Sequence, residues 1–194
     1  MLGVPSMISA KALVSRRQSK VAGYLLRTRS HPAVLPVAPL TRRCETGGMR
    51  AVVQRVSRAE VRAADGESIG AIGPGLCVLV GVTHDDSAVT ARKMADKMWH
   101  LRVMADDDGV MNCSVADTSR EILVVSQFTL YGDTRGGRRP SWIAAAPPEH
   151  AEPVIEVLVA RLRELGAAVA TGRFRTHMLV ELVNDGPVTV LLDV

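Results

Sequence analysis

Polar residues end the most strand-like segment of the chain. "EILVVSQFTLYG" (residues 121–132) runs from apolar residues into Ser126, Gln127, Phe128 and Thr129. An extended strand would place successive side chains on opposite faces, with Ser126 and Phe128 on one and Gln127 and Thr129 on the other. Two hydroxyls and an amide there either satisfy nearby backbone groups or form a polar patch that holds or attacks a carbonyl. The residues alone leave both interpretations open.

A nucleophilic hydroxyl needs a neighbouring base, and none is evident in the sequence. Each histidine is interpreted as a surface or helix-capping residue: His31, His84, His100, His150 and His177. There is no Gly-x-Ser-x-Gly elbow, and the three cysteines lack the spacing of zinc ligands. The acidic turn at 106–109 lacks the alternating ligands and the distal Glu of a calcium loop. We therefore expect no hydrolase triad, no metal and no cofactor.

A glycine-containing basic loop follows the polar residues. "TRGGRRPSW" (134–142) carries Arg135, Arg138 and Arg139 around two glycines. Arginine offers paired donors to phosphate, and glycine lets a backbone approach closely. The loop is either a solvated surface segment or a phosphate contact.

The C-terminal segment "LVNDGPVTVLLDV" (182–194) contains a second unusual combination. Two apolar runs, Val180–Val183 and Val188–Leu192, read as strands, and Asn184-Asp185-Gly186-Pro187 separates them. These four residues are common in turns. A two-residue turn would join two strands more simply. From the residues alone, it is open whether Gly186 and Pro187 do more than turn the chain.

The elements that must position these residues alternate between strand and helix from Met49 onward. A helix capped by Asp85 or Asp86 should bury Ala91, Met94, Ala95, Met98 and Leu101. A second helix starts near Pro147, although Pro153 is awkward and favours a later start. Strands are expected at 50–57, 59–64, 67–72, 76–82 and 121–132, besides the two C-terminal runs. This order predicts an α+β domain with a largely antiparallel sheet or barrel covered by two helices.

Residues 1–48 differ from the rest of the chain. They hold eight Lys/Arg and one acid, a charge of +7, which leaves −3 of the total of +4 for residues 49–194. Bulk charge therefore gives no support for nucleic-acid binding by the body. The basic segment is a disordered tail, an organellar presequence, or upstream sequence read from a start codon ahead of the true one. We favour the last, because regular patterning begins abruptly at Met49.

The composition sets further bounds. Hydrophobic residues make up 47%, enough for a core, whereas 3% aromatics leave little for a base-stacking surface. Few, widely spaced cysteines favour a reducing compartment. No apolar run approaches the roughly 20 residues that span a bilayer. We expect a cytoplasmic protein without a membrane segment, or an organellar one if residues 1–48 are a presequence.

Several motifs together resemble the D-aminoacyl-tRNA deacylases. The similarity runs in order over residues 49–194, and the pair Ser-Gln-Phe-Thr with Asn-x-Gly-Pro-Val-Thr is its most specific part. Residues 1–48 lie outside it. One departure is Arg175-Thr176, where the family usually has small residues after Thr-Gly-Arg-Phe. The motifs are "MRAVVQRVSRAEV" (49–61), "GPGLCVLVGV" (73–82), "SQFTLYGD" (126–133), "GRRPSW" (137–142), "TGRF" (171–174) and "LVNDGPVT" (182–189).

The resemblance implies hydrolysis of the ester between a D-amino acid, or glycine, and the 3′ end of tRNA. It implies a homodimer whose active sites lie at the subunit interface. Residues 126–129 would form the pocket floor, with Thr129 as a hypothetical nucleophile, and Met178 would line the pocket. Gly186 and Pro187, joined by a cis bond beside Asn184, would reach in from the partner and reject L-amino acids. The tRNA 2′-hydroxyl would assist the reaction.

Two other functions are weighed against this one. Some relatives have been described as binding DNA, so a nucleic-acid-binding module is one alternative. The editing domain of certain threonyl-tRNA synthetases is the other, because it shares the fold but lacks this combination of motifs. The negative body and the scarcity of aromatics argue against the DNA-binding alternative.

Overall fold

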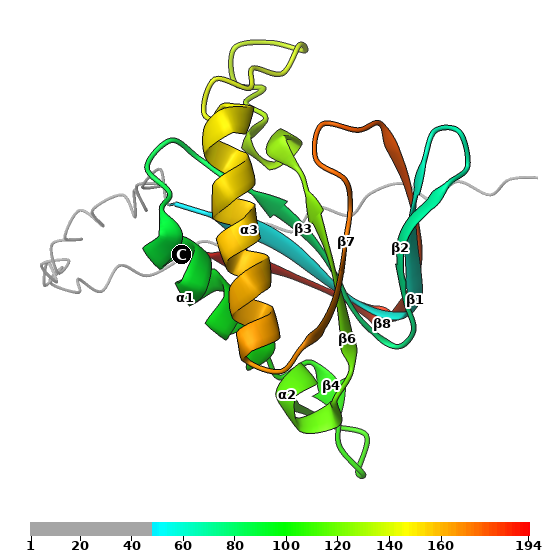
Figure 1. Cartoon of the computed structure of the whole chain (residues 1–194). Helices are drawn as coiled ribbons and strands as arrows, with labels where there is room; N and C mark the ends of the chain where they lie inside the picture. The colour runs from blue at the N-terminus through cyan, green and yellow to red at the C-terminus, as the bar shows by residue number, and fades with distance from the viewer. Residues whose placement is uncertain (1–47) are drawn as a thin grey trace, which may run out of the picture. The chain divides into compact units, whose positions relative to one another are not determined.

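The computed structural model describes residues 48–194, so the interpretations of residues 1–47 and of His31 and Cys44 concern a segment outside the described residues. The described part forms a mixed α+β fold (Figure 1). Its elements are β1 (Arg50–Ala63), β2 (Ser68–Ile72), β3 (Gly75–Gly81), α1 (Ala88–Trp99), β4 (Met104–Ala105), β5 (Met111–Cys113), α2 (Val115–Thr118), β6 (Glu121–Ser126), the 3₁₀-helix η1 (Phe128–Tyr131), α3 (Pro148–Glu164), β7 (Ala168–Thr171) and β8 (Met178–Asp193).

The main sheet is mixed, and most of its pairing is antiparallel, as predicted. Its strands follow the order β2-β1-β3-β6-β7, and β8 pairs with β1. β1 is antiparallel to β2, β3 and β8, as expected. The pairs β3–β6 and β6–β7 are parallel. The reason is that the chain crosses over through α1 and through α3, and such crossovers return strands in parallel.

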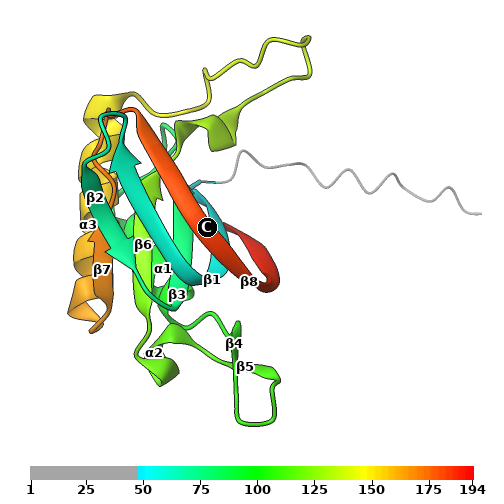
Figure 2. The same cartoon turned by 90° about the vertical axis from the view of Figure 1, so that its right-hand side faces the viewer.

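The sheet curls until its ends nearly meet (Figure 2). A methyl group on Gly70 of β2 would lie 2.7 Å from the carbonyl oxygen of Thr171 in β7, so glycine permits this approach. The curl encloses a small apolar cluster that includes Val56, Cys77 and Leu123. Cys77 is a buried core residue, and this burial raises the pKa of its thiol to about 11.

Two main helices cover the other face of the sheet (Figure 1). α1 buries Ala91, Met94, Ala95 and Met98, whereas Leu101 falls beyond its end. Its N-cap is Ser87, not Asp85 or Asp86, because Asp86 accepts the N–H of Thr83 in the preceding turn. α3 begins at Pro148 and contains Pro153 without a shifted start. Among residues 48–194, no helix is long and apolar enough to cross a membrane.

The predicted strand at 121–132 is shorter than expected. β6 ends at Ser126, and Gln127 makes one more ladder contact, from its N–H to the carbonyl of Val80 at 2.7 Å. The chain then winds into η1, where Leu130 N–H donates to Gln127 and Gly132 N–H donates to Thr129. The alternation of faces predicted for residues 126–129 is therefore wrong, because a 3₁₀ turn replaces the extended backbone.

The two predicted C-terminal strands are one strand with a bulge. β8 pairs with β1 on both sides of residues 184–187, through Thr189 opposite Gln54 and Asn184 opposite Val56. Residues 185–188 of β8 therefore face Arg55 alone and must leave the plane of the sheet. The expected turn is wrong because β1 is a continuous 14-residue strand that pairs with both halves of β8.

Candidate active site

A cavity of about 570 Å³ opens where β6 passes into η1. It brings together four of the predicted site residues, Ser126, Gln127, Phe128 and Met178. Thr129 is exposed beside it and does not line it. The remaining walls come from the end of β3, the segment before α3 and the loop before β8, through Val82, Val125, Trp142, Ala145, Ala146, Pro148, Ala151, Arg173, Phe174, Arg175, Thr176 and Val180.

The backbone at the start of η1 provides unshared donors. Phe128 and Thr129 occupy the first turn of η1, where N–H groups have no acceptor within the helix. The Gln127 amide donates to the Thr129 hydroxyl, which fixes both side chains relative to this turn. Main-chain N–H groups of this kind can stabilise an oxyanion at the cavity floor.

None of the four histidines in the described part of the chain lines the cavity. His84 contacts the carbonyl of Ile143 at 2.8 Å, and His150 contacts that of Asp86 at 2.8 Å. His100 contacts the carbonyl of Asp96 at the end of α1, at 2.9 Å. His177 is exposed. The predicted surface and capping roles are confirmed for these four, and the Ser126 and Thr129 hydroxyls have no imidazole base beside them.

The loop after β7 forms one side of the cavity, a role that sequence analysis did not assign. The Arg173 guanidinium makes a double ion pair with Glu67, at 2.9 and 3.1 Å, and its backbone N–H donates to the sulfur of Met178 at 3.3 Å. Phe174 lies next to it in the wall. The "TGRF" motif could have pointed to this loop, because it is one of the motifs shared with the family. Its residue types alone do not indicate a chemical role.

Arg175 lies where the sequence departs from the family pattern. Its φ of 56° is left-handed, a region that glycine adopts more readily than arginine. Small residues at this point therefore suit the backbone that this loop requires. The side chain lines the cavity, and its guanidinium lies 3.7 Å from the carboxylate of Glu149.

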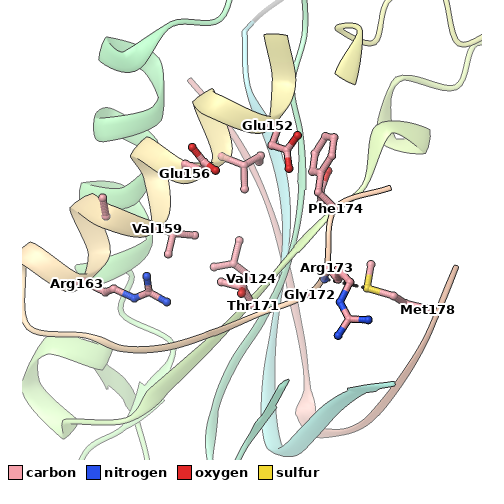
Figure 3. Close-up of a pocket in the computed structure, with 13 residues that line it drawn as sticks. Val124, Glu152, Glu156, Val159, Arg163, Thr171, Gly172, Arg173, Phe174 and Met178 are labelled. Atoms are coloured by element: carbon pink, nitrogen blue, oxygen red, sulfur yellow. Dashed lines mark hydrogen bonds between the residues drawn. The ribbon is translucent and has the colours of Figure 1, made fainter. Parts of the chain in front are cut away.

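A second cavity of about 280 Å³ adjoins the first (Figure 3). Ser126, Phe174 and Met178 line both cavities. α3 contributes Glu152 and Glu156, whose carboxylates line this cavity. Sequence analysis missed both residues. Their four-residue spacing on a helix puts them on one face, but that pattern is equally typical of a solvated surface.

The bulge in β8 presents Gly186 and Pro187 outward. The bond between them is cis, as the resemblance implies, and Gly186 has a φ of 147°. Asn184 spans the bulge, because its side chain accepts from Val188 N–H at 2.8 Å and donates to the Val188 carbonyl at 3.2 Å. Gly186 and Pro187 are exposed and line neither cavity. Within this chain, neither cavity therefore brings them together with Ser126.

Arg55 anchors this bulge, and sequence analysis missed it. Its Nε donates to the Asp185 carbonyl at 2.8 Å, and its Nη1 donates to the Val103 carbonyl at 2.7 Å. Only 14% of the side chain is exposed. Arg55 thus ties the residue before Gly186 to the segment that precedes β4. An arginine in a strand gives no sequence signal for this role, because its partners, two backbone carbonyls and the Asp185 carboxylate at 3.4 Å, lie far from it along the chain.

The basic loop projects from the body of the fold (Figure 2). Trp142, at the end of the loop, lines the first cavity. Asp133 and Ser141 pair through two backbone hydrogen bonds of 2.8 Å and close the loop. Trp142 then packs edge-on against Phe128, with ring centroids 5.5 Å apart. The Arg135 side chain bonds Asp133 and lowers the pKa of that carboxyl to about 2. Arg138 and Arg139 are exposed.

Known proteins resemble this chain over the described part. The profile of the family described as D-Tyr-tRNA(Tyr) deacylase matches residues 52–193. A D-aminoacyl-tRNA deacylase of Streptomyces coelicolor is 57% identical over 147 residues, which are 75% of this chain and 100% of the relative. One of Nocardia farcinica is 60% identical over 148 residues, 75% of this chain and 99% of the relative.

Two solved structures share the fold. A c-Myc DNA unwinding element binding protein has a TM-score of 0.70 and 41% identity, covering 74% of this chain and 97% of its own. A probable eukaryotic D-amino acid tRNA deacylase has a TM-score of 0.65 and 14% identity, covering 75% and 99%. The second likeness concerns the fold alone.

Replacement of Arg55 by alanine should release the bulge. We expect Arg55→Ala to lower the free energy of unfolding by about 2–4 kcal/mol, because two charge-assisted hydrogen bonds to backbone carbonyls are lost, one of them partly buried. Arg55→Lys should recover only part of this, because an ammonium group lacks the planar fork. Urea denaturation measures the change. Exposed Arg58 on the same strand is the control, and an equal loss in Arg58→Ala would contradict the assignment.

Proposed function

The chain belongs to the D-Tyr-tRNA(Tyr) deacylase family, and from that premise we propose that it hydrolyses the ester bond of D-aminoacyl-tRNA and of tRNA mischarged with glycine. It is a hydrolase that acts on aminoacyl-tRNA. The observation that carries the proposal is a cavity floored by Ser126, Gln127 and Phe128, with unshared main-chain donors and with none of the described histidines in its walls. Release of the amino acid would recycle the tRNA and keep D-residues out of translation.

The N–H groups of Phe128 and Thr129 act as the oxyanion hole in this proposal. Ester hydrolysis places negative charge on the carbonyl oxygen in the transition state, and preorganised donors in a pocket stabilise it. The support is their position in the first turn of η1, next to the cavity. Ser126 and Gln127 hold the substrate around this point. No metal or cofactor takes part.

The substrate itself supplies the group that assists attack on the ester. A serine or threonine nucleophile requires a base that accepts its proton. The Thr129 hydroxyl accepts a hydrogen bond from the Gln127 amide, which is not a base. In our proposal the 2′-hydroxyl of the terminal ribose assists attack, and Thr129 orients Gln127 instead of attacking the ester.

A second copy of the chain completes the site. β8 is a 16-residue strand at the edge of the sheet, and such an edge favours pairing with another chain. It also exposes apolar side chains, namely Leu179, Val180, Val183 and Leu191. We assign this surface to a homodimer in which Gly186 and Pro187 of each subunit enter the cavity of its partner. A twofold dimer gives both subunits the same site.

Main-chain atoms of Gly186 and Pro187 then select the amino acid. Gly186 has no side chain, so its backbone can approach the substrate closely. Carbonyls fixed by the bulge would hold the amino group and leave no space for an L side chain. Glycine has no side chain to reject and would be hydrolysed. Asn184 shapes the bulge that carries these two residues.

The basic loop is assigned to the tRNA. Arg138 and Arg139 are exposed at the tip of a loop whose base packs on Phe128 through Trp142, beside the cavity. Arginine is suited to phosphate contacts. Arg135 shapes the loop through Asp133 and extends the same basic surface.

We place this activity in the cytoplasm, where aminoacyl-tRNA is used.

DNA binding without hydrolysis is the competing function, and the name of one structurally similar protein, a c-Myc DNA unwinding element binding protein, motivates it. The net charge of −3 on residues 49–194 disfavours it, since phosphate neutralisation drives such binding. A threonyl-tRNA-synthetase-type editing domain is the other alternative. It would select a particular side chain instead of a configuration.

A panel of three aminoacyl-tRNAs separates these functions. We expect cleavage of D-Tyr-tRNA and Gly-tRNA, with L-Tyr-tRNA spared by a factor of about 100 or more, since exclusion by backbone is steric. The measurement is release of labelled amino acid by the purified full chain. Binding of duplex DNA without cleavage of any ester would contradict the proposal.

Loss of the Thr129 hydroxyl should slow the reaction only moderately. Thr129→Ala should retain the single-turnover rate within about tenfold, because one neutral hydrogen bond contributes about 1 kcal/mol. Thr129→Ser is the matched control that keeps the hydroxyl. D-Tyr-tRNA ending in 2′-deoxyadenosine should lose far more. A loss of several thousandfold in Thr129→Ala alone would instead indicate a nucleophile.

A methyl group at Gly186 should disable the site. An added Cβ would lie 2.6 Å from Val188 Cγ2 and 2.7 Å from Val188 N, at a φ that L-residues avoid. We expect Gly186→Ala to lower D-Tyr-tRNA hydrolysis about 100-fold, because displacement of a positioning group by about 1 Å has this effect. Gly109 also has a positive φ, 78°, but lies in an open turn away from the site, so Gly109→Ala should keep its activity. Equal activity in both variants would refute the assignment of Gly186.

A further inference from the structure

Three of the six aromatic residues of the chain line the first cavity, namely Phe128, Trp142 and Phe174. The proposed oxyanion hole uses only the main chain of Phe128, so the reaction gives no role to the aromatic rings. The exposed fractions of Phe128 and Trp142 are 56% and 40%. Rings of this size are well buried on average. Two accessible rings in the wall of a cavity that takes a nucleic acid therefore call for a ligand.

The indole of Trp142 is held in a fixed position. Its ring meets that of Phe128 nearly at right angles, with 78° between the planes and 5.5 Å between the centroids. It also packs against the backbone of Gly132, where an added Cβ would lie 2.5 Å from the indole Cζ3 and 3.2 Å from Cη2. A side chain at position 132 would therefore displace the indole. Trp142 is thus a flat, preorganised surface that stays partly open, as the stacking of a base requires.

The basic loop ends at this ring. Asp133 and Ser141 close the loop through paired backbone hydrogen bonds, and Trp142 is the next residue. Arg138 and Arg139 are exposed farther along the same loop. Proteins bind single-stranded nucleic acid by combining positive charge along the backbone with aromatic rings on which the bases stack. Trp142 and the two arginines supply both parts of this combination.

The size of the cavity indicates which nucleotide meets Trp142. Pockets that hold one drug-sized ligand measure about 300–1,000 Å³, and this cavity measures about 570 Å³. The aminoacyl ester and the terminal adenosine together have that size, so the nucleotide before them lies outside. The strand then leaves past Trp142 toward the arginines of the loop. We propose that Trp142 stacks on the base of the penultimate nucleotide of the tRNA 3′ end.

This contact rests on the proposed function, because the ester at the cavity floor sets the position of the nucleotide. Stacking uses the π face that every base has, and it is tolerant of sequence. The presence of a base at the penultimate position should therefore matter more than its identity. Substrates with the same 3′ end would then be bound alike, whichever tRNA carries it.

Substrates of two lengths test the contact. D-Tyr is esterified to adenosine or to an RNA minihelix with an unpaired CCA end. Trp142→Ala should lower kcat/KM for the minihelix ester about tenfold more than for the adenosine ester, mainly through KM, because the contact is remote from the reacting atoms. Trp142→Phe should recover most of this, and Ile143→Ala, at the 85% exposed neighbour, should change neither substrate. An equal loss on both substrates, or no loss, would overturn the proposal.

An abasic penultimate nucleotide tests the same contact without a change in the protein. The wild-type kcat/KM for this minihelix ester should fall about tenfold, and Trp142→Ala should cause no further loss on it. Any natural base at that position should restore the wild-type value. Full activity on the abasic substrate would overturn the proposal even if Trp142→Ala failed to fold.

Fluorescence of Trp142 reports the stacking without hydrolysis. Trp99 is the other tryptophan of the chain, so Trp99→Phe leaves Trp142 as the single emitter. An uncharged minihelix should quench its emission, and the abasic minihelix should not. Quenching without deacylation would support the stacking and refute the proposed function. Deacylation without quenching would refute the stacking alone.

Discussion

The pairing of β8 with β1 on both sides of Arg55 is the constraint on which the site depends. Thr189 is fixed opposite Gln54, and Asn184 is fixed opposite Val56, so the residues between them cannot lie in the sheet. The Arg55 guanidinium holds the Asp185 carbonyl, and Asn184 closes the bulge from the other side. The bulge that carries Gly186 and Pro187 is thus held in place by the sheet and not by a flexible loop. Such support suits residues that must be positioned to within a fraction of an ångström.

The proposed chemistry also relies on main-chain groups more than on side chains. The cavity floor offers main-chain N–H groups, and the bulge offers main-chain carbonyls. Neither depends on a titrating residue, and the four described histidines contact carbonyls elsewhere or lie exposed. A site of this kind requires the substrate to bring its own hydroxyl. Discrimination between D- and L-amino acids then depends on steric fit, because main-chain atoms, unlike side chains, cannot move away by changing rotamer.

The sequence predicted the strands of the curled sheet except β7, both main helices and four of the residues that line the first cavity. Residue types and motif spacing carry that information locally. It did not predict that β6 stops at Ser126, because Phe128–Tyr131 are as apolar and aromatic as a strand. It divided β8 in two, because Gly186 and Pro187 are turn residues unless a continuous partner strand lies beside them. Arg55 and Phe174 were missed because their roles depend on distant backbone atoms.

The central claim is that each site combines residues 126–129 of one subunit with Gly186 and Pro187 of the other, and mixed dimers test it most directly. Subunits with Gly186→Ala are combined with subunits in which Gln127 and Phe128 are replaced by alanine, after each variant alone is shown to be inactive. Random reassortment should restore about a quarter of the wild-type D-Tyr-tRNA hydrolysis, because half of the dimers then hold one intact site. No recovery in verified mixed dimers would show that the site lies within one subunit and contradict the claim.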